Sequence, residues 1–464
     1  MRGTRDWNLK SSRGTNVSRT IAYVIITALT LSSLGACDFS DIAHEASKIE
    51  LVETPEPPVE SKPSAGSGKI EVIDVNGDRI ETEVDVVEEG EAEDNAANQL
   101  PEANLAAAAQ NMALPTNFNF AYSSLDDSGR LCYREIYLII SEMMTRVELT
   151  SKDPDEVDLA FRAVMLDHPE IFYVKGYSIV KYMNGKKLSK IAFSGTYTMS
   201  ADEVKQGMAE VDAYVRDVTS NCPKNAGDYE TIKYVYDYLI KSNEYVRDSE
   251  NNQNILSVVR NGKTVCQGYT KVMQLLLTKM GIFCTVVNGT ACGRGGVPDA
   301  EELKDAENAE WGGHVWNIVE CNGMYYNVDV TWGDSAITLL NTDGSLSTDL
   351  EVNYEFFLVS DDYMADTHEP KPVVPMPKCV SMEDSYYQHE GLYFTQVDPS
   401  QFYRAFESSL SSGQSIVYIK ASDREVYDRI KEHLFDEQNV FEYIGRTNVR
   451  YVEFAERNLM MISL

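Results

Sequence analysis

Residues 262–289 read GKTVCQGYTKVMQLLLTKMGIFCTVVNG, and residues 312–334 read GGHVWNIVECNGMYYNVDVTWGD; these two segments carry the strongest structural signals in the sequence. In the first, an apolar run with helical spacing follows Cys266 and stops at Gly281. The run predicts a buried helix with Cys266 at or near its N-terminus. Free N–H groups and a partial positive charge at that end favour the thiolate, which is the nucleophilic form of cysteine.

The second stretch predicts a β-hairpin. Asn322-Gly323 is a strong signal for a two-residue turn, and both flanking segments are rich in β-branched and aromatic residues. A loop centred on these two residues places Cys321 opposite Met324. The pairing of every later residue in the hairpin follows from this register.

The predicted register places His314, Trp316, Asp329 and Thr331 on one face of the hairpin. Asp329 is then the diagonal neighbour of His314, at about 7–8 Å between backbones, a gap that a carboxylate and an imidazole bridge. A nucleophile at a helix start, a base on a strand and an acid that orients the base form a pattern for nucleophilic catalysis. A slip of one residue would separate the base from the acid, so the arrangement depends on the turn.

These motifs resemble the core of the transglutaminase-like superfamily. The similar segments are Val-Cys-Gln-Gly-Tyr, the helix that ends in Lys-Met-Gly-Ile, Gly-His-Val-Trp-Asn and Tyr-Asn-Val-Asp-Val-Thr-Trp. The resemblance implies an α+β fold with a papain-like core, in which a helix bearing Cys266 packs on an antiparallel sheet bearing His314 and Asp329. It also implies that these three residues are catalytic. The family includes cross-linking transglutaminases, peptide:N-glycanases, cysteine proteases and inactive members.

Two residues compete with the proposed base and acid. His368 is the rival of His314, but it lies in a loop-like Asp-Thr-His-Glu-Pro run with no hairpin partner. Asp334 is the rival of Asp329, but it follows a glycine, where a turn acid is expected. We therefore predict His314 and Asp329 as the pair.

Other residues are candidates to complete the site. Acyl transfer needs an oxyanion donor, and the backbone N–H of Cys266 is expected to be one. The side chain of Gln253 or Asn254, shortly upstream, is a candidate second donor. Trp316 and Trp332 are expected to be walls of the site or core residues.

No metal or cofactor is expected. The sequence has no Cys-x-x-Cys pair that would indicate structural zinc, and it has no EF-hand loop, so the calcium dependence of animal cross-linking relatives is not carried over. Of the eight cysteines, Cys284 and Cys321 lie in apolar runs typical of core thiols. Cys37 is assigned to a lipid anchor and Cys266 to catalysis. The disulfide connectivity of the other six cysteines stays open.

Residues 1–36 are typical of an export signal, because a basic segment precedes the apolar run 21–34, which is short for a membrane span. Leu34-Gly35-Ala36-Cys37 resembles a bacterial lipobox, which predicts diacylation of Cys37 and a membrane-anchored lipoprotein at the cell surface or envelope. An ordinary signal peptide that happens to precede a cysteine is the alternative. The net charge of −32 argues against a nucleic-acid partner and favours solubility.

The composition divides the remaining chain into four segments. An acidic segment rich in Pro and Gly predicts a disordered tether, in which one hairpin around Asn76-Gly77 is too small to count as a domain. A polar insert, residues 290–312, is expected to lie beside the site as a lid or specificity loop. The segments are a tether at 37–112, an N-terminal α+β domain at 113–222, the catalytic core at 223–370 and a small C-terminal α/β domain at 371–464.

The sequence thus predicts an exported, lipid-anchored cysteine enzyme that acts on protein or peptide amide bonds through a thioester. It leaves open whether the acyl acceptor is water, as in a protease, or an amine, as in a cross-linking enzyme. The natural substrate, the oligomeric state and the role of the C-terminal domain also stay open. The alternatives are a catalytically silent surface scaffold and a wall-binding module.

Overall fold

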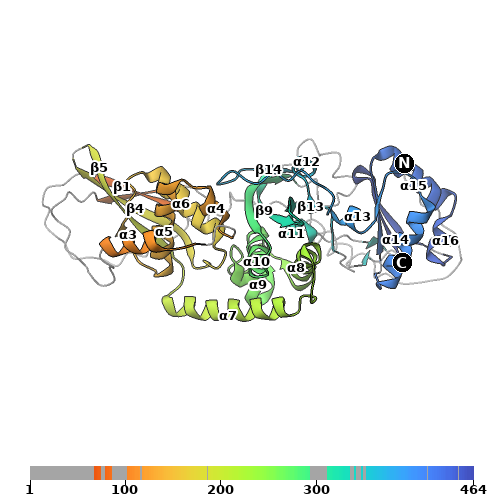
Figure 1. Ribbon diagram of the computed structural model, residues 1–464, viewed down its shortest axis with the longest axis horizontal. Helices are drawn as coiled ribbons and strands as arrows, with labels where there is room; N and C mark the ends of the chain where they lie inside the picture. The colour runs from red at the N-terminus through yellow and green to blue at the C-terminus, as the bar shows by residue number, and fades with distance from the viewer. Residues whose placement is uncertain are drawn as a thin grey trace, which may run out of the picture.

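The computed structural model describes residues 67–74, 79–85, 102–114, 118–184, 186–292, 311–334, 339–340, 346–347, 352–414, 416–447 and 449–464. Three groups of elements follow one another along the longest axis of the molecule (Figure 1). Each group is built around its own sheet, and helices pack against it. The chain has an α+β fold, as its sequence predicts.

The first group contains a five-stranded sheet with the order β2-β1-β4-β5-β3. Its two long central strands form a hairpin in which Asn184 pairs with Lys187 next to the turn. Helix α6 begins with a proline in its first turn, and the Asp153 side chain caps it by accepting a hydrogen bond from Asp155 N. The elements are β1 (Ser67–Asp74), β2 (Arg79–Asp85), α3 (Glu102–Asn111), α4 (Phe120–Ser124), α5 (Asp127–Ser141), β3 (Val147–Glu148), α6 (Pro154–Asp167), β4 (Val174–Asn184) and β5 (Lys187–Tyr197).

The prediction of a disordered tether over residues 37–112 is wrong for β1, β2 and α3. The predicted hairpin forms, but it also joins the body, because β1 pairs with β4 from Glu71↔Ile179 to Asp74↔Gly176. The edge of β4 offers unpaired backbone groups, which an alternating segment satisfies despite its acidic composition. Helix α3 packs on α5 and buries Leu105 and Ala109. The export signal and Cys37 lie outside the described residues.

Removing residues 1–112 should therefore lower the melting temperature by several degrees relative to removing residues 1–66. The longer deletion uncovers the surface that Leu105 and Ala109 cover, and burial of one leucine alone contributes about 1.5–3 kcal/mol. It also exposes the edge of β4. Calorimetry of the two shortened proteins measures the difference, and equal melting temperatures would show that α3 and β1 contribute nothing to stability.

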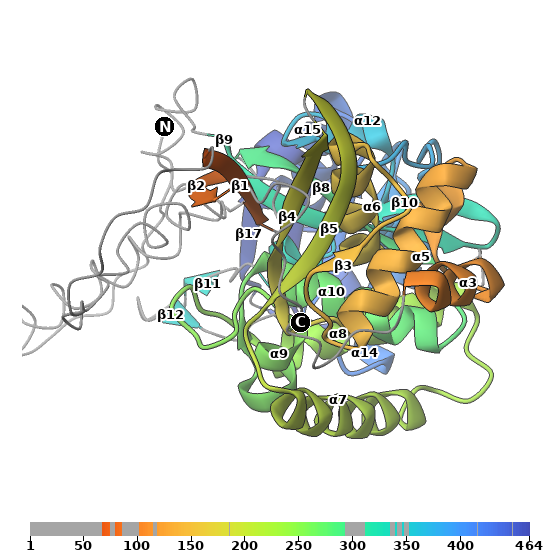
Figure 2. The ribbon, with the colours of Figure 1, turned by 90° about the vertical axis from the view of Figure 1, so that its left-hand side faces the viewer.

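Helix α7 (Ala201–Ser220) runs alongside the first two groups (Figures 1 and 2). It begins with a capping box. The Ser200 hydroxyl accepts a hydrogen bond from Glu203 N, and the Glu203 carboxylate accepts one from Ser200 N at 2.8 Å. This helix carries the chain from the first sheet to the second group.

The second group contains a five-stranded sheet with the order β13-β10-β9-β8-β14, and α10 packs against β8 and β9. Short strands β6 and β7 pair in parallel beside the start of α10. The elements are α8 (Asp228–Ser242), β6 (Glu244–Tyr245), α9 (Ile255–Asn261), β7 (Lys263–Thr264), α10 (Cys266–Lys279), β8 (Cys284–Cys292), β9 (Trp311–Cys321), β10 (Met324–Val328), α11 (Val330–Gly333), β11 (Leu339–Leu340), β12 (Leu346–Ser347), β13 (Phe357–Val359), α12 (Asp361–Met364) and β14 (His368–Pro370).

The predicted hairpin register is confirmed between β9 and β10. Met324 pairs with Cys321, and both turn residues, Asn322 and Gly323, have positive φ angles of 51° and 80°. The expectation that this strand reaches Thr331 is wrong, because the ladder ends at Val328↔Asn317. The next residue, Asp329, leaves the strand to cap α11.

The third group is a small sheet with the order β15-β16-β18-β17 and its helices. A buried lysine, Lys420, joins it to the second group by donating to Glu355 Oε1 at 3.1 Å and to the Tyr363 hydroxyl at 2.9 Å. Among the described residues, none of the helices is both long enough and apolar enough to cross a membrane. The elements are α13 (Tyr386–His389), β15 (Tyr393–Phe394), α14 (Pro399–Ser411), β16 (Ile416–Ala421), α15 (Arg424–Lys431), η3 (Glu432–Asp436), α16 (Val440–Ile444), β17 (Tyr451–Phe454), η4 (Ala455–Arg457) and β18 (Leu459–Ser463).

Candidate active site

Cys266 is the first residue of α10, where the sequence places it. One turn later, the Thr270 hydroxyl donates to the carbonyl of Val315 at 3.2 Å, and Asn317 Nδ2 donates to the carbonyl of Thr270 at 3.1 Å. Residues four apart lie on the same side of a helix. These bonds therefore hold the start of α10 against the part of β9 that carries His314.

Gly268 allows the first turn of α10 to approach β7 closely. A Cβ atom at this position would lie 1.8 Å from Thr264 Oγ1 and 2.9 Å from Thr264 Cβ. The Thr264 hydroxyl is itself fixed, because it bonds to Ser257 Oγ at 2.7 Å and to the carbonyl of Asn252 at 3.0 Å. The glycine of the Cys-Gln-Gly motif is therefore required by packing beside Cys266.

Gly268→Ala should destabilise the protein by about 1–3 kcal/mol or more, the usual cost of forcing an extra carbon into a packed site. The displaced first turn should also reduce the reactivity of Cys266. Urea denaturation measures the change, with Gln267→Ala as the matched control because it adds no atoms to the same turn. A Gly268→Ala protein as stable as that control would mean that α10 and β7 do not approach this closely.

His314 and Asp329 form a fully buried hydrogen-bonded pair. His314 Nε2 lies 2.6 Å from Asp329 Oδ2, and both side chains are 0% exposed. A carboxylate only accepts, so the imidazole proton lies on Nε2 and the lone pair of the neutral ring lies on Nδ1. Within the described residues, His314 Nδ1 has no hydrogen-bond partner. It is the atom at which this histidine is able to accept a proton.

The carboxylate of Asp329 is held by three hydrogen bonds. Oδ1 accepts from Trp332 N at 3.0 Å, and Oδ2 accepts from His314 and from His368. Burial alone would raise the pKa of Asp329, but the charges and hydrogen bonds of the two histidines outweigh it and hold that pKa well below its usual range. Asp329 is therefore ionised near neutral pH.

His368 belongs to this site, and the sequence interpretation of it is wrong. It is not in a partnerless loop but begins β14, which pairs with β8 through His368↔Ala291. Its Nε2 lies 3.1 Å from Asp329 Oδ2, so it adds to the His314–Asp329 pair instead of replacing it. The three-residue strand is too short for its periodicity to be visible in the sequence.

The cluster of His314, Asp329 and His368 has the side-chain types that can bind a metal, and its donor atoms lie within 4.8 Å of one another. Both Nε2 atoms already lie at hydrogen-bond distance from the same carboxylate oxygen. A cation would have to replace both of these bonds. Hydrogen bonding accounts for the arrangement, and the expectation that the site uses no metal stays a prediction.

Trp316 and Trp332 pack around the two histidines. Their ring centres lie 6.2 Å and 5.8 Å from that of His314, and both side chains are buried. Gln253, in contrast, is exposed in the turn before α9, and Asn254 uses its side-chain oxygen to cap α9. The role of Gln253 as an oxyanion donor therefore stays a prediction, and so does that of the Cys266 backbone N–H.

Asp334, the rival acid, does not contact His314 but accepts a hydrogen bond from the Tyr269 hydroxyl in the first turns of α10. Burial raises the pKa of Asp334 to about 7, against the opposing effect of that bond. Its ionised form is thus the unfavourable one in the folded protein. The free energy of unfolding should fall as the pH rises from about 4 through 7, and Asp334→Asn should reduce this fall when denaturation is measured across that range.

The cysteines differ in their chemical state. Cys266 is disulfide-bonded and only 1% exposed. Chemistry at this residue requires the thiol, so the assays below start from reduced protein. Cys284 and Cys321 are buried strand residues, as predicted. The thiols among the described residues are Cys132, Cys222, Cys284, Cys292, Cys321 and Cys379.

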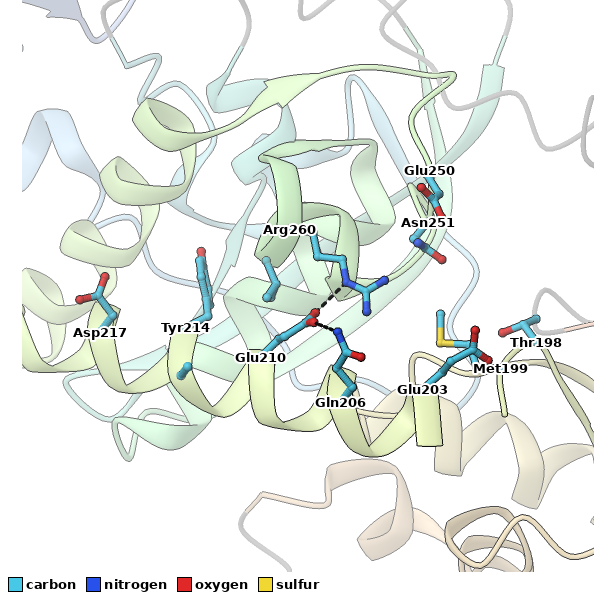
Figure 3. Close-up of a pocket in the computed structure, with 12 residues that line it drawn as sticks. Thr198, Met199, Glu203, Gln206, Glu210, Tyr214, Asp217, Glu250, Asn251 and Arg260 are labelled. Carbon is cyan, nitrogen blue, oxygen red and sulfur yellow. Dashed lines mark hydrogen bonds and ion pairs between the residues drawn. The ribbon is translucent and has the colours of Figure 1, made fainter. Parts of the chain in front are cut away.

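A groove of about 890 Å³ lies between α7 and the segment that leads into α9 (Figure 3). Arg260 crosses it and bonds to Glu210 at 2.7 Å. The other charged lining residues are all carboxylates, namely Glu203, Asp217 and Glu250. The lining does not include Cys266, His314 or Asp329, so this acidic groove is separate from the candidate site. The central part of the predicted lid, residues 293–310, lies outside the described residues.

Comparison with known proteins agrees with the geometry. Residues 212–330, which contain Cys266, His314 and Asp329, match the model of the transglutaminase-like superfamily. This part of the chain is therefore similar to a transglutaminase-like core, as the motifs predict.

The relatives found are distant. Kyphoscoliosis peptidase of Mus musculus is 26% identical over 140 residues, which are 29% of this chain and 20% of the relative, so the match spans about a fifth of that protein. A solved TGase structure is similar over 33% of this chain and 44% of its own, at 12% identity and a TM-score of 0.22. A cysteine protease structure from Cytophaga hutchinsonii, described as putative, covers 33% and 61% at 11% identity and a TM-score of 0.20. Such low TM-scores do not place individual residues.

Proposed function

We propose that the protein is an exported, lipid-anchored cysteine enzyme that transfers the acyl group of a protein or peptide amide through a thioester on Cys266. His314 accepts the thiol proton at Nδ1 and returns it to the leaving amine, and Asp329 orients His314 and stabilises its cation. The bond formed is Sγ–C(acyl), and the bond broken is the amide C–N. Attack by water or by a second amine then releases the acyl group.

One observation carries the proposal most strongly. His314 and Asp329 are fully buried and bonded at 2.6 Å, with His314 Nδ1 unoccupied by any hydrogen bond among the described residues. A histidine with only a packing role usually has both ring nitrogens satisfied. The position of Cys266 at the start of α10 adds a helix N-terminus, which stabilises a thiolate.

The location is a separate part of the proposal and rests on the sequence alone. Leu34-Gly35-Ala36-Cys37 after an apolar run supports a lipid anchor at Cys37 in the cell envelope. Fatty-acid labelling of the wild type and of Cys37→Ala tests it. A wild-type protein that takes up no label would remove this part and leave the chemistry untouched.

A mixed peptide library incubated with the reduced protein, with and without added primary amines, tests the chemistry. New peptide termini or deamidated side chains indicate water as the acceptor, and amine-tagged peptides indicate cross-linking. Cys266→Ala is the control, because it removes only the sulfur. Loss of all products in that variant is expected, and products that persist would rule out the thioester.

A catalytically silent scaffold is the second candidate. The burial of Cys266, at 1% exposed, and its disulfide favour this reading, because a substrate must reach the sulfur. A scaffold would yield no product in the library assay after reduction. It would also leave Cys266 unreactive toward small alkylating agents, whatever residue 314 is.

A further inference from the structure

We propose that His368 is a positioning residue, which donates a second hydrogen bond to Asp329 and thereby fixes the carboxylate and the tautomer of His314. The inference rests on the proposed function, because it concerns the same site. Its basis is geometric. Two imidazoles from different strands meet at one carboxylate oxygen, at 2.6 Å and 3.1 Å.

The strand between the two histidines makes this meeting possible. In β8, Gly289 pairs with His314 and Ala291 pairs with His368, so these positions share one face of the sheet. Neither residue has a large side chain. The two imidazoles therefore reach across β8, and their ring centres lie 5.5 Å apart. A Cβ atom at Gly289 would lie 2.4 Å from the carbonyl oxygen of Glu369 and 2.7 Å from a ring carbon of Trp316, so this position has no room for a larger side chain.

The hydrogen bonds of His368 define its tautomer. Nε2 faces a carboxylate and therefore carries a proton. Nδ1 lies 2.8 Å from Thr367 Oγ1, whereas that hydroxyl is 3.4 Å from its other acceptor, the carbonyl of Met364. The shorter contact is the stronger bond, so the hydroxyl donates to Nδ1 and the imidazole is neutral.

The surroundings of His368 keep it neutral. It is 2% exposed, and burial lowers its pKa by more than the bond to Asp329 raises it. The charged or titratable groups that act on it are Asp329, His314 and Arg457. Aromatic rings with centres 5.0, 4.4 and 5.3 Å away enclose it: those of Trp316, Trp332 and Phe356.

The two donors on Asp329 Oδ2, from His314 and His368, restrict the orientation of the carboxylate. With Trp332 N on Oδ1, both oxygens of the Asp329 carboxylate are held, and rotating the group away from His314 would break the other two bonds as well. His314 Nε2–H is then committed to Asp329, and the Nδ1 lone pair remains for the thiol proton. The bond from His368 also disperses part of the Asp329 charge, which limits how strongly Asp329 favours the His314 cation.

Nitrogen NMR of the full, reduced protein with ¹⁵N-labelled histidine tests this role without requiring turnover. The chain has six histidines, and the His314 signals are identified by their loss in His314→Ala. In the wild type, His368 should be in the neutral Nε2–H form at and above neutral pH. A His368 that titrates as a cation there, or that carries its proton on Nδ1, would overturn the proposal before any further variant is made.

Two variants then separate donation from packing. His368→Phe keeps a ring but removes the donor, and the titration midpoint of His314 should rise by about one pH unit. His368→Gln places an amide N–H near the same position and should restore the midpoint. His389→Phe, which alters a histidine stacked on Tyr229 at 3.5 Å, is the control and should change nothing. A merely structural His368 predicts lower stability in both variants with an unmoved His314 midpoint, and that result would refute the proposal.

A failure of the proposed enzyme function and a failure of the proposed role of His368 give different results. A His314 midpoint that shifts as expected in a protein without turnover would keep His368 as a positioning residue and reject the enzyme. Turnover with an unmoved midpoint would keep the enzyme and reject the role of His368.

Discussion

Replacing His314 with alanine should slow the alkylation of Cys266 by iodoacetamide about 10–100-fold near pH 6.5, after reduction and removal of the reductant. A cysteine beside an imidazolium or at a helix start has a pKa of about 3.5–7.5 in place of about 8.5, so at this pH its thiolate fraction is far larger. The difference between wild type and variant should shrink as the pH approaches 9, where an ordinary thiol also ionises. Mass-spectrometric labelling rates for each cysteine measure it.

The chain supplies an internal control for this labelling. Cys222 is only half-buried, and burial, opposed by a hydrogen bond from Thr231, raises its pKa. Burial also raises the pKa of the thiols at Cys132, Cys284, Cys321 and Cys379. Cys266 should therefore be labelled first, and Cys222 should react at the same rate in both proteins. A Cys266 rate that is unchanged in His314→Ala would leave the core as a scaffold.

Asp329→Asn should reduce turnover by on the order of 10⁴-fold, the size of effect expected when the orienting acid of a triad becomes an amide. In this variant the asparagine side-chain oxygen accepts the hydrogen bond from Trp332 N. The asparagine NH₂ group then faces the Nε2–H donors of His314 and His368. His314 relieves this conflict by moving its proton to Nδ1, which removes the base. Alkylation of Cys266 should fall less than turnover, because Asp329 acts through His314.

Asp334→Asn is the matched control for that substitution. It makes the same chemical change in the rival acid, which bonds to Tyr269 and not to a histidine. Burial already raises the pKa of Asp334 to about 7, so the neutral amide resembles a form that is well populated near neutral pH. Turnover should stay within a few-fold of wild type. A larger loss in Asp334→Asn than in Asp329→Asn would mean that the acid has been assigned to the wrong residue.

The sequence predicts the parts of the site that local signals specify. Asn322-Gly323 determines the turn and hence the register of β9 and β10, and the run after Cys266 determines the start of α10. Asp329 meets His314 even though the strand ends at Val328 and does not reach Thr331, because Asp329 directly follows the last pair of the ladder and caps α11.

Long-range pairing explains what the sequence does not predict. His368 reaches the site through a three-residue strand whose partner, Ala291, is far away in the chain. The hairpin of β1 and β2 has a clear local pattern, but its attachment to β4 depends on an edge about 100 residues later. No local pattern identifies the partner strand in either case, so each pairing requires the assembled sheet.

The central claim is that an acyl group passes through Cys266. Its most direct test is the mass of the Cys266 peptide after the reduced protein has been mixed with the peptide library and quenched in acid. We expect an added acyl mass on Cys266 that hydroxylamine removes, as it does from thioesters, and no such mass in His314→Ala. Turnover of the library without any hydroxylamine-sensitive adduct on Cys266, or unchanged turnover in Cys266→Ala, would rule out a thioester on Cys266.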